Sequence, residues 1–389
     1  MKKYSAIFFG ACFVLVLMAC SRQGVTGGTS NENVIRIGVS ASVSGDGAAA
    51  GKMITQPIEL FAKSIDNKVT HKASGKTYEI QFIVEDNENR PEVAATVNRR
   101  LIDEHKVAAI IGPDASKTML AAAPVAQSAK IPQIGTFPTN EKVTQVGNYI
   151  FRACFIDPFQ GKVAAKYAYE NLNARRAAIL YNNADDYPTG LQRSFSENFK
   201  ALGGAVVRVE EYTGSEVKDY SVQLSAIKSS DADVIFLPNL YVELPLQVQQ
   251  IRQMNITLPI VGGDSFDISE VVTIAGPAID GVQYVAAFSA DSADPQAQEF
   301  SKMYFDATGI QPNSNVVLSW ESAMIVYNAI QNAAEVTPDG IRNAMAAIKN
   351  LQTPSGNFSF DENRNPTKSA QIIRYNAQGQ RSYVTTVNP

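Results

Sequence analysis

The sequence predicts an α/β protein made of two lobes, each built on a doubly wound, mainly parallel sheet. The chain has 389 residues, 45% of them hydrophobic and 19% charged, which is enough to bury more than one core. Apolar runs of strand length alternate with amphipathic stretches of helix length, as expected for a parallel sheet covered on both faces. The alternation restarts after residue 155, so we expect a second sheet.

The N-terminus is typical of an export signal. Lys2 and Lys3 precede an apolar run over residues 6–19, which is shorter than the roughly 20 residues of a bilayer span. We therefore expect a cleaved signal peptide over 1–19, with an uncleaved anchor as the alternative. The run ends in Leu17-Met-Ala-Cys20, which resembles a bacterial lipobox and implies a lipid on Cys20. Residues 20–33 are polar and Gly-rich, and we expect a flexible tether there.

Charge and cysteine content restrict the partners and the chemistry. The net charge of −4 becomes −6 when two signal lysines are removed, so no basic field exists to hold nucleic acid. Cys12 leaves with the signal and Cys20 would carry lipid, so Cys154 has no disulfide partner. We expect Cys154 to be a small buried residue, with a reactive thiol as the alternative.

The first half of the folded chain shows a regular strand and helix order. Strands are expected at 34–40, 78–85, 107–111 and 131–134. Ile54, Ile58, Phe61 and Ile65 fall at helical spacing, and a second helix should begin after Pro91, because proline suits a first turn. A third helix is expected over 118–129.

The second half repeats the rhythm. Strands are expected at 176–181, 205–211, 233–238 and 258–261, and helices at 161–172, 190–202, 220–228 and 243–254. Residues 281–290 are expected to be extended and 320–334 helical, with late strands at 357–360 and 371–375.

The residue types needed for catalysis or metal binding are missing. His71 and His105 lack ligands at i+3 or i+4, and we expect both to lie on the surface rather than to bind zinc. No nucleophile elbow or Walker-type loop occurs, and Gly45-Asp-Gly47 is only a fragment of a dinucleotide fingerprint. The acidic stretch 85–88 lacks calcium-loop spacing, and we expect a solvated loop there or the wall of a cleft. We expect no enzyme, no cofactor and no metal.

Polar residues directly after predicted strands are more informative. Ser116 follows one strand and begins a helix, where unpaired N–H groups attract anions, although a helix cap is the alternative. Thr139 follows the next strand, and Asp264 follows the strand at 258–261, although Gly-Gly-Asp also suits a turn. Strand ends form the ligand crevice of open α/β sheets. Two hydroxyls and one carboxylate would suit a zwitterion.

At these residues the chain resembles the periplasmic substrate-binding lipoproteins of branched-chain amino acid ABC transporters, the leucine/isoleucine/valine-binding type. The matching stretches, between about Val34 and Tyr375, are Ile35-Arg-Ile-Gly-Val-Ser, Ile110-Ile-Gly-Pro with Ser116, Ile131-Pro with Thr139-Asn140, Asp186-Tyr-Pro-Thr-Gly190, Tyr212-Thr-Gly, Asp233-Val-Ile-Phe-Leu-Pro, Ile260-Val-Gly-Gly-Asp264 and Trp320-Glu-Ser-Ala.

The resemblance implies a type I periplasmic binding fold with its ligand between two lobes joined by a three-strand hinge. Lobe 1 would comprise 34–155 and 287–365, and lobe 2 would comprise 156–286 and 366–389. It implies that Ser116 and Thr139 hold the ligand carboxylate, and that Thr139, the Phe137 carbonyl and Asp264 hold its ammonium.

Three further wall residues follow from the same resemblance. Tyr187 would close on the ligand, Trp320 would wall the side-chain pocket, and a further aromatic position falls at Leu240 or Tyr241. This chain departs from the family where Ala50 replaces a bulky aromatic and where Asp264 replaces glutamate. Ala115 replaces one half of a disulfide. The changes at Ala50 and Asp264 reshape the pocket, so the ligand need not be leucine, isoleucine or valine, whereas the missing disulfide affects only stability.

We expect an extracytoplasmic solute-binding lipoprotein, monomeric and anchored by lipid to the bacterial cell envelope. It would capture an amino acid and deliver it to an ABC permease. The alternatives are a lipoprotein that feeds a sensor or chemoreceptor, and a binder of another small molecule such as an amide or an organic acid.

Overall fold

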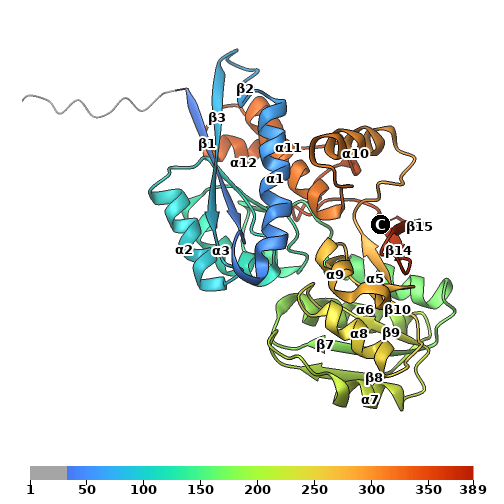
Figure 1. Ribbon diagram of the computed structural model, residues 1–389. Helices are drawn as coiled ribbons and strands as arrows, with labels where there is room; N and C mark the ends of the chain where they lie inside the picture. Colours follow the sequence, from blue (N-terminus) through green and yellow to red (C-terminus); the bar gives the residue numbers. More distant parts are fainter. Residues whose placement is uncertain (1–32, 389) are drawn as a thin grey trace, which may run out of the picture. The chain divides into compact units, whose positions relative to one another are not determined.

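The computed structural model describes residues 33–388, which contain two large sheets and one small one (Figure 1). The first sheet has the order β2 (Lys68–Thr70), β3 (Thr77–Asp86), β1 (Val34–Ala41), β4 (Ala109–Ile111), β5 (Gln133–Gly135) and β6 (Ile150–Arg152). The second has the order β15 (Arg381–Val387), β14 (Ala370–Tyr375), β11 (Gln283–Ala286), β10 (Ile260–Gly262), β9 (Val234–Leu237), β7 (Arg176–Asn182) and β8 (Ala205–Tyr212). The small sheet pairs β12 (Leu351–Thr353) with β13 (Gly356–Phe358).

Helices cover both faces of the first sheet. They are α1 (Ala48–Ser64), α2 (Pro91–Asp103), α3 (Ser116–Ala129), the short α4 (Lys142–Gln145), α10 (Pro295–Thr308), α11 (Ser314–Asn332) and α12 (Pro338–Ala346). Ala109 and Ile111 of β4 pack in the cluster that contains α1 and α11, whereas Ile110 packs with α2 and α3. This alternation is the period of two expected of a strand buried on both faces.

The second sheet is built in the same way. Its helices are α5 (Asp157–Glu170), α6 (Asp186–Ala201), α7 (Ser221–Lys228), α8 (Leu244–Gln253) and α9 (Ser269–Ala275). Ala177 and Ile179 of β7 pack with α5 and α6, and Ala178 and Leu180 pack with α7, α8 and α9. The predicted pair of doubly wound sheets is confirmed. Among the described strands of the two large sheets, only the pairs β2–β3, β11–β14 and β14–β15 are antiparallel.

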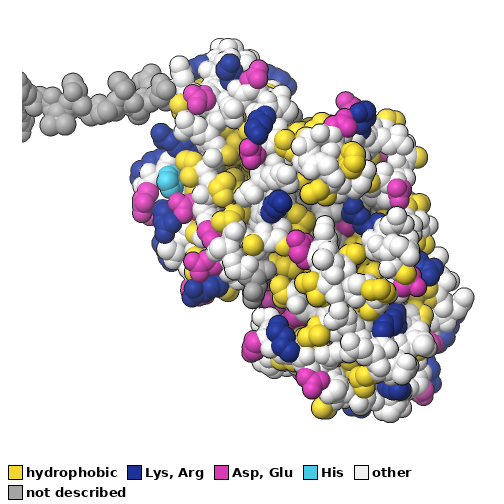
Figure 2. Space-filling model, viewed as in Figure 1, with side chains coloured by type: hydrophobic (Ala, Val, Ile, Leu, Met, Phe, Trp, Pro, Cys, Tyr) yellow, Lys and Arg dark blue, Asp and Glu magenta, His cyan; other side chains and the backbone are white. Residues whose placement is uncertain are grey.

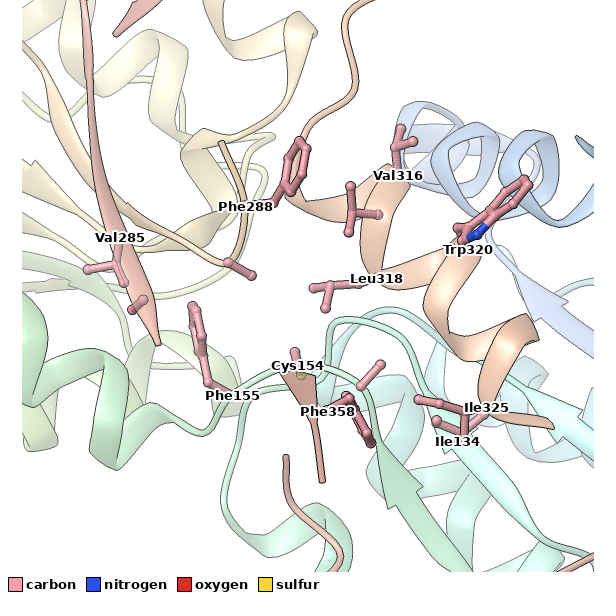
Figure 3. Close-up of a cluster of buried hydrophobic side chains, with 14 of the residues drawn as sticks. Ile134, Cys154, Phe155, Val285, Phe288, Val316, Leu318, Trp320, Ile325 and Phe358 are labelled. Carbon is pink, nitrogen blue, oxygen red and sulfur yellow. The ribbon is translucent and has the colours of Figure 1, made fainter. Parts of the chain in front are cut away.

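The chain passes between the two sheets three times, after β6, after β11 and before β14. Apolar side chains pack these passages together (Figure 3). Phe155 follows β6, Phe288 follows β11, and Leu318 projects from α11. Each of these side chains is 2% exposed. Cys154 is buried and free, which confirms the prediction of a small buried residue, and burial raises the pKa of its thiol to about 12.

Several elements differ from the sequence prediction. Strands β2, β6, β12 and β15 and helices α4, α9, α10 and α12 were not predicted. Helix α11 begins at Ser314 rather than at residue 320, because the Asn313 side chain caps it by accepting from the Val316 amide. Helix α6 begins at Asp186 rather than at residue 190, because Asp185 caps it in the same way.

The prediction that both histidines lie on the surface was wrong for His71. Its side chain is buried, and its two ring nitrogens lie 2.8 Å from Ser74 Oγ and 2.7 Å from the Ala333 carbonyl oxygen. An imidazole with both nitrogens bonded can be buried at little cost. Asn87 of the acidic stretch is also buried, between Ser40 and Ser42.

Neither a metal site nor a membrane span is found in the described part of the chain. Residues 33–388 contain no group of His, Cys, Asp and Glu arranged to hold a metal ion. Every helix within this range is too short or too polar to cross a bilayer. Charged side chains of both signs are interspersed over the face shown in Figure 2, in agreement with the absence of a basic field in the sequence.

Candidate functional site

A small cavity lies where the carboxyl ends of strands from both sheets meet. Its volume is about 50 Å³. The first sheet and its helices contribute Ala50, Asp114, Ala115, Ser116, Phe137 and Asn315, and the second contributes Tyr187, Leu240, Tyr241, Asp264, Ser265 and Ile268. The loops after β4, β5, β9 and β10 supply most of these residues, which is the usual position of a ligand crevice in doubly wound sheets.

The N-terminus of α3 forms one wall. Ser116 is the first residue of this helix and is 3% exposed. Its Oγ accepts a hydrogen bond from the backbone N–H of Asn140 at 3.2 Å, so its own proton stays available for a ligand. The unpaired N–H groups of the first turn and the positive end of the helix dipole favour a carboxylate here.

Asp264 forms the facing wall. It is 8% exposed, and its Oδ1 accepts from the Tyr187 hydroxyl at 2.8 Å and from Gln160 Nε2 at 3.3 Å. Gly263 allows this approach, since a Cβ there would lie 2.2 Å from the Tyr187 oxygen. Burial raises the pKa of Asp264 to about 6, although the bonds from Tyr187 and Gln160 lower it. Within the described residues Oδ2 accepts no hydrogen bond, so it remains for a ligand cation.

Thr139 lies beside this cavity rather than on its wall. The side chain is fully buried, and its hydroxyl makes no hydrogen bond of good geometry within residues 33–388. It is close enough to Asp157 to lower the pKa of that carboxyl, but burial dominates and raises the Asp157 pKa to about 8. The backbone continues from Phe137, which is on the wall, and the Thr139 carbonyl accepts from the Asp157 amide at 2.9 Å.

Trp320 is placed in the hydrophobic core. Figure 3 shows its side chain on α11. Its ring packs edge-on against Phe61 at 5.2 Å and against Phe300 at 5.3 Å between centroids, and it does not line the cavity. Leu240 and Tyr241 both line the cavity, so each of the two positions left open by the sequence contributes to the wall.

Comparison with known proteins identifies the family. The model of the periplasmic binding protein family matches residues 34–380. The chain belongs to the periplasmic binding protein family. It is similar to the branched-chain amino acid transporter substrate binding protein LivJ from Streptococcus pneumoniae, solved in complex with isoleucine. That structure is 30% identical, with a TM-score of 0.85, and the match covers 92% of this chain and all of that one.

Two further relatives are informative. An amino acid binding protein from Pseudomonas aeruginosa is 29% identical over 78% of this chain and 79% of its own length. A solute binding protein of an ABC transporter from Rhodopseudomonas palustris, solved with 3,4-dihydroxy benzoic acid, is 22% identical with a TM-score of 0.82. The match covers 92% of this chain and 98% of that one, and at this identity it supports the fold alone.

As a periplasmic binding protein, this chain has a site that can hold a zwitterion. The Ser116 end provides neutral donors to an anion, and Asp264 provides a carboxylate to a cation. Sequence reasoning missed Asp114, Asn315, Ser265 and Ile268. Asp114 could have been found, since it stands two residues before Ser116, whereas Asn315 could not, because the start of its helix was placed at residue 320.

A second contact joins the two walls outside the cavity. Lys117 Nζ of α3 lies 3.6 Å from Asp185 Oδ2 at the start of α6, and Asn140 Nδ2 donates to the Asp186 carbonyl at 2.9 Å. The Lys117 side chain is 28% exposed, so water only partly screens this ion pair. These contacts link the loops that carry the cavity residues of both sheets.

Proposed function

We propose that this protein captures a free α-amino acid between its two lobes and delivers it to an ABC permease. One observation supports this most directly. The N-terminus of α3, with Ser116, and the carboxylate of Asp264 line the same buried cavity. An anion alone would give Asp264 no favourable partner, whereas an amino acid brings a carboxylate to one end and an ammonium to the other.

We also propose that the mature protein is a monomer held outside the cytoplasm by a lipid on Cys20. This residue lies outside the described residues, so the proposal rests on the lipobox. The isoleucine in the LivJ relative supports an amino acid as ligand. The two lobes, 34–155 with 287–365 and 156–286 with 366–389, would close on that ligand about the three connecting segments.

Calorimetry on the ligand-free mature protein tests the central proposal. Each candidate amino acid is titrated beside its deaminated analogue, which keeps the carboxylate and the side chain. We expect the amino acid to bind at least tenfold more tightly, about 1.4 kcal/mol. Equal affinity within each pair would remove the ammonium site from the proposal and favour an organic acid as the ligand.

Uptake of the labelled ligand in cells with and without this gene distinguishes a permease partner from a sensor. We expect uptake to fall in the deletion strain. Unchanged uptake with a lost transcriptional or chemotactic response would instead favour the sensor alternative.

A further inference from the structure

The cavity contains a second carboxylate that neither end of a zwitterion needs. Asp114 lies on the wall formed by the first sheet, in the loop between β4 and α3, and is 4% exposed. It makes no ion pair at hydrogen-bond range within residues 33–388, because the nearby Lys117 pairs with Asp185 instead. Burial raises the pKa of Asp114. Its carboxylate accepts from backbone N–H groups at Asp114 and Ala115, and a side-chain donor would stabilise it further.

The one side chain that faces Asp114 cannot supply that donor in full. Ser42 Oγ lies 3.2 Å from Asp114 Oδ1 but only 2.7 Å from Asn87 Oδ1. The side-chain amide of Asn87 is held in one orientation, because its Nδ2 donates to Ser40 Oγ and its Oδ1 accepts from the backbone N–H of Asn89. A serine hydroxyl has a single hydrogen, and the shorter contact to Asn87 takes it. Apart from backbone N–H groups, Asp114 therefore receives only this long contact, and it can accept a further hydrogen bond from a ligand.

A second polar group lines the same cavity without a partner. Asn315, in the first turn of α11, is 5% exposed, and its side-chain amide makes no hydrogen bond with any described residue. Because Asn315 lines the cavity and its amide has no protein partner among the described residues, the amide can hydrogen-bond a ligand. Asp114 offers an acceptor and Asn315 offers both a donor and an acceptor.

The size of the cavity limits the ligand. Its volume is about 50 Å³, so the two walls must separate to admit any amino acid. A long lysine or arginine side chain would require the largest separation, although its charge would suit Asp114. A short side chain with a hydroxyl or a carboxamide would require the least.

We propose that the ligand is an α-amino acid whose short, uncharged side chain donates a hydrogen bond to Asp114 and bonds the amide of Asn315, rather than a branched aliphatic amino acid. The inference rests on the proposed capture of an amino acid and names its class: hydroxyl or carboxamide side chains.

Two pairs of amino acids of nearly equal shape test the inference. Threonine is compared with valine and asparagine with leucine, by calorimetry on the ligand-free mature protein. We expect the polar member of at least one pair to bind at least tenfold more tightly, since a site built to hydrogen-bond a ligand rejects the analogue that lacks the donor. Equal binding, tighter binding of the aliphatic members, or no binding of any of the four would overturn the inference.

Variants assign the preference to Asp114. In Asp114→Leu the polar preference should shrink at least tenfold or reverse in favour of leucine, because the acceptor is replaced by an apolar group of similar size. Asp103→Asn removes one carboxylate from an exposed position on α2 and should leave both ratios unchanged. A polar preference that persists in Asp114→Leu would overturn the assignment, and if that variant does not fold, the ratios of the native protein still decide the ligand class.

The same titrations separate this inference from the proposed function. Tight binding of valine or leucine would overturn the polar-ligand inference and leave the capture of an amino acid intact. Binding of deaminated acids as tight as that of the amino acids would overturn both.

Discussion

Asp264→Asn should weaken amino acid binding by roughly 30-fold to 1,000-fold. The substitution keeps the shape of the side chain and removes the charge that faces the ligand ammonium. Because Asp264 is buried, removing one member of that pair should cost about 2–4 kcal/mol. The Oδ1 position can still accept from Tyr187 and Gln160, so the local structure should survive.

The pH dependence of binding gives a second signature of the same group. The pKa of Asp264 without ligand is raised to about 6 by burial, and only the ionised carboxylate attracts an ammonium. Protonation competes with binding, so affinity should be constant above about pH 7 and fall about tenfold by about pH 5. In Asp264→Asn this fall should be absent.

Calorimetry from pH 5 to pH 8.5 measures both effects, with melting temperatures as the control for folding. Glu270→Gln is the matched control. It removes an exposed carboxylate from the first turn of α9, a helix that covers the second sheet, and Asp264 follows strand β10 of the same sheet. It should change neither the affinity nor its pH profile. An Asp264→Asn protein that binds the amino acid as tightly as native, with an unchanged profile, would refute the assignment of Asp264 to the ammonium.

Four more outcomes are expected. Ser116→Ala should weaken binding by about 1–3 kcal/mol at an unchanged melting temperature, and calorimetry that shows no loss would leave Ser116 only its bond from the Asn140 backbone N–H. Lys117→Met should speed ligand release severalfold in stopped-flow experiments, since about 1 kcal/mol of ion pairing across the cleft is lost; an unchanged release rate contradicts this role. Burial raises the Asp157 pKa to about 8, so folding takes up a proton between about pH 4 and pH 8 and the stability of the native protein should fall as pH rises through that window. Melting curves at pH 5 and pH 8.5 should show a smaller loss of stability in Asp157→Asn than in the native protein. Cys20→Ala should abolish fatty acid labelling, and labelled variant protein would place the lipid elsewhere.

The sheets were predictable because their strands carry a strong local signal. The β4 and β9 strands are continuous apolar runs, and β1 and β7 are buried on both faces, so periodicity and length alone identify them. The missed elements lack a strong apolar pattern. Strand β2 has only three residues and lies at an antiparallel edge, and the main sequence signal for α10 is its Asp294 cap followed by a proline.

The site was predictable where a residue follows a strand directly. Ser116, Phe137, Tyr241 and Asp264 were all found from strand ends and the family resemblance, and all four line the cavity. Whether they bind a ligand stays a prediction. The start of a helix was harder to predict. Helix α11 begins at Ser314, after the cap at Asn313, which is six residues before the predicted start, and its first turn places Asn315 rather than Trp320 on the cavity wall.

The two carboxylates of the cavity also explain why a ligand would be needed for closure. Asp264 and Asp114 are both buried at the cavity, and this burial raises the pKa of each. Without a ligand, closure must either bury these charges or bind protons, and both cost free energy at neutral pH. An amino acid with a polar side chain would supply an ammonium to one carboxylate and a donor to the other. The proposed ligand would therefore bind the closed arrangement much better than the open one, and this difference in affinity would shift the population toward closure.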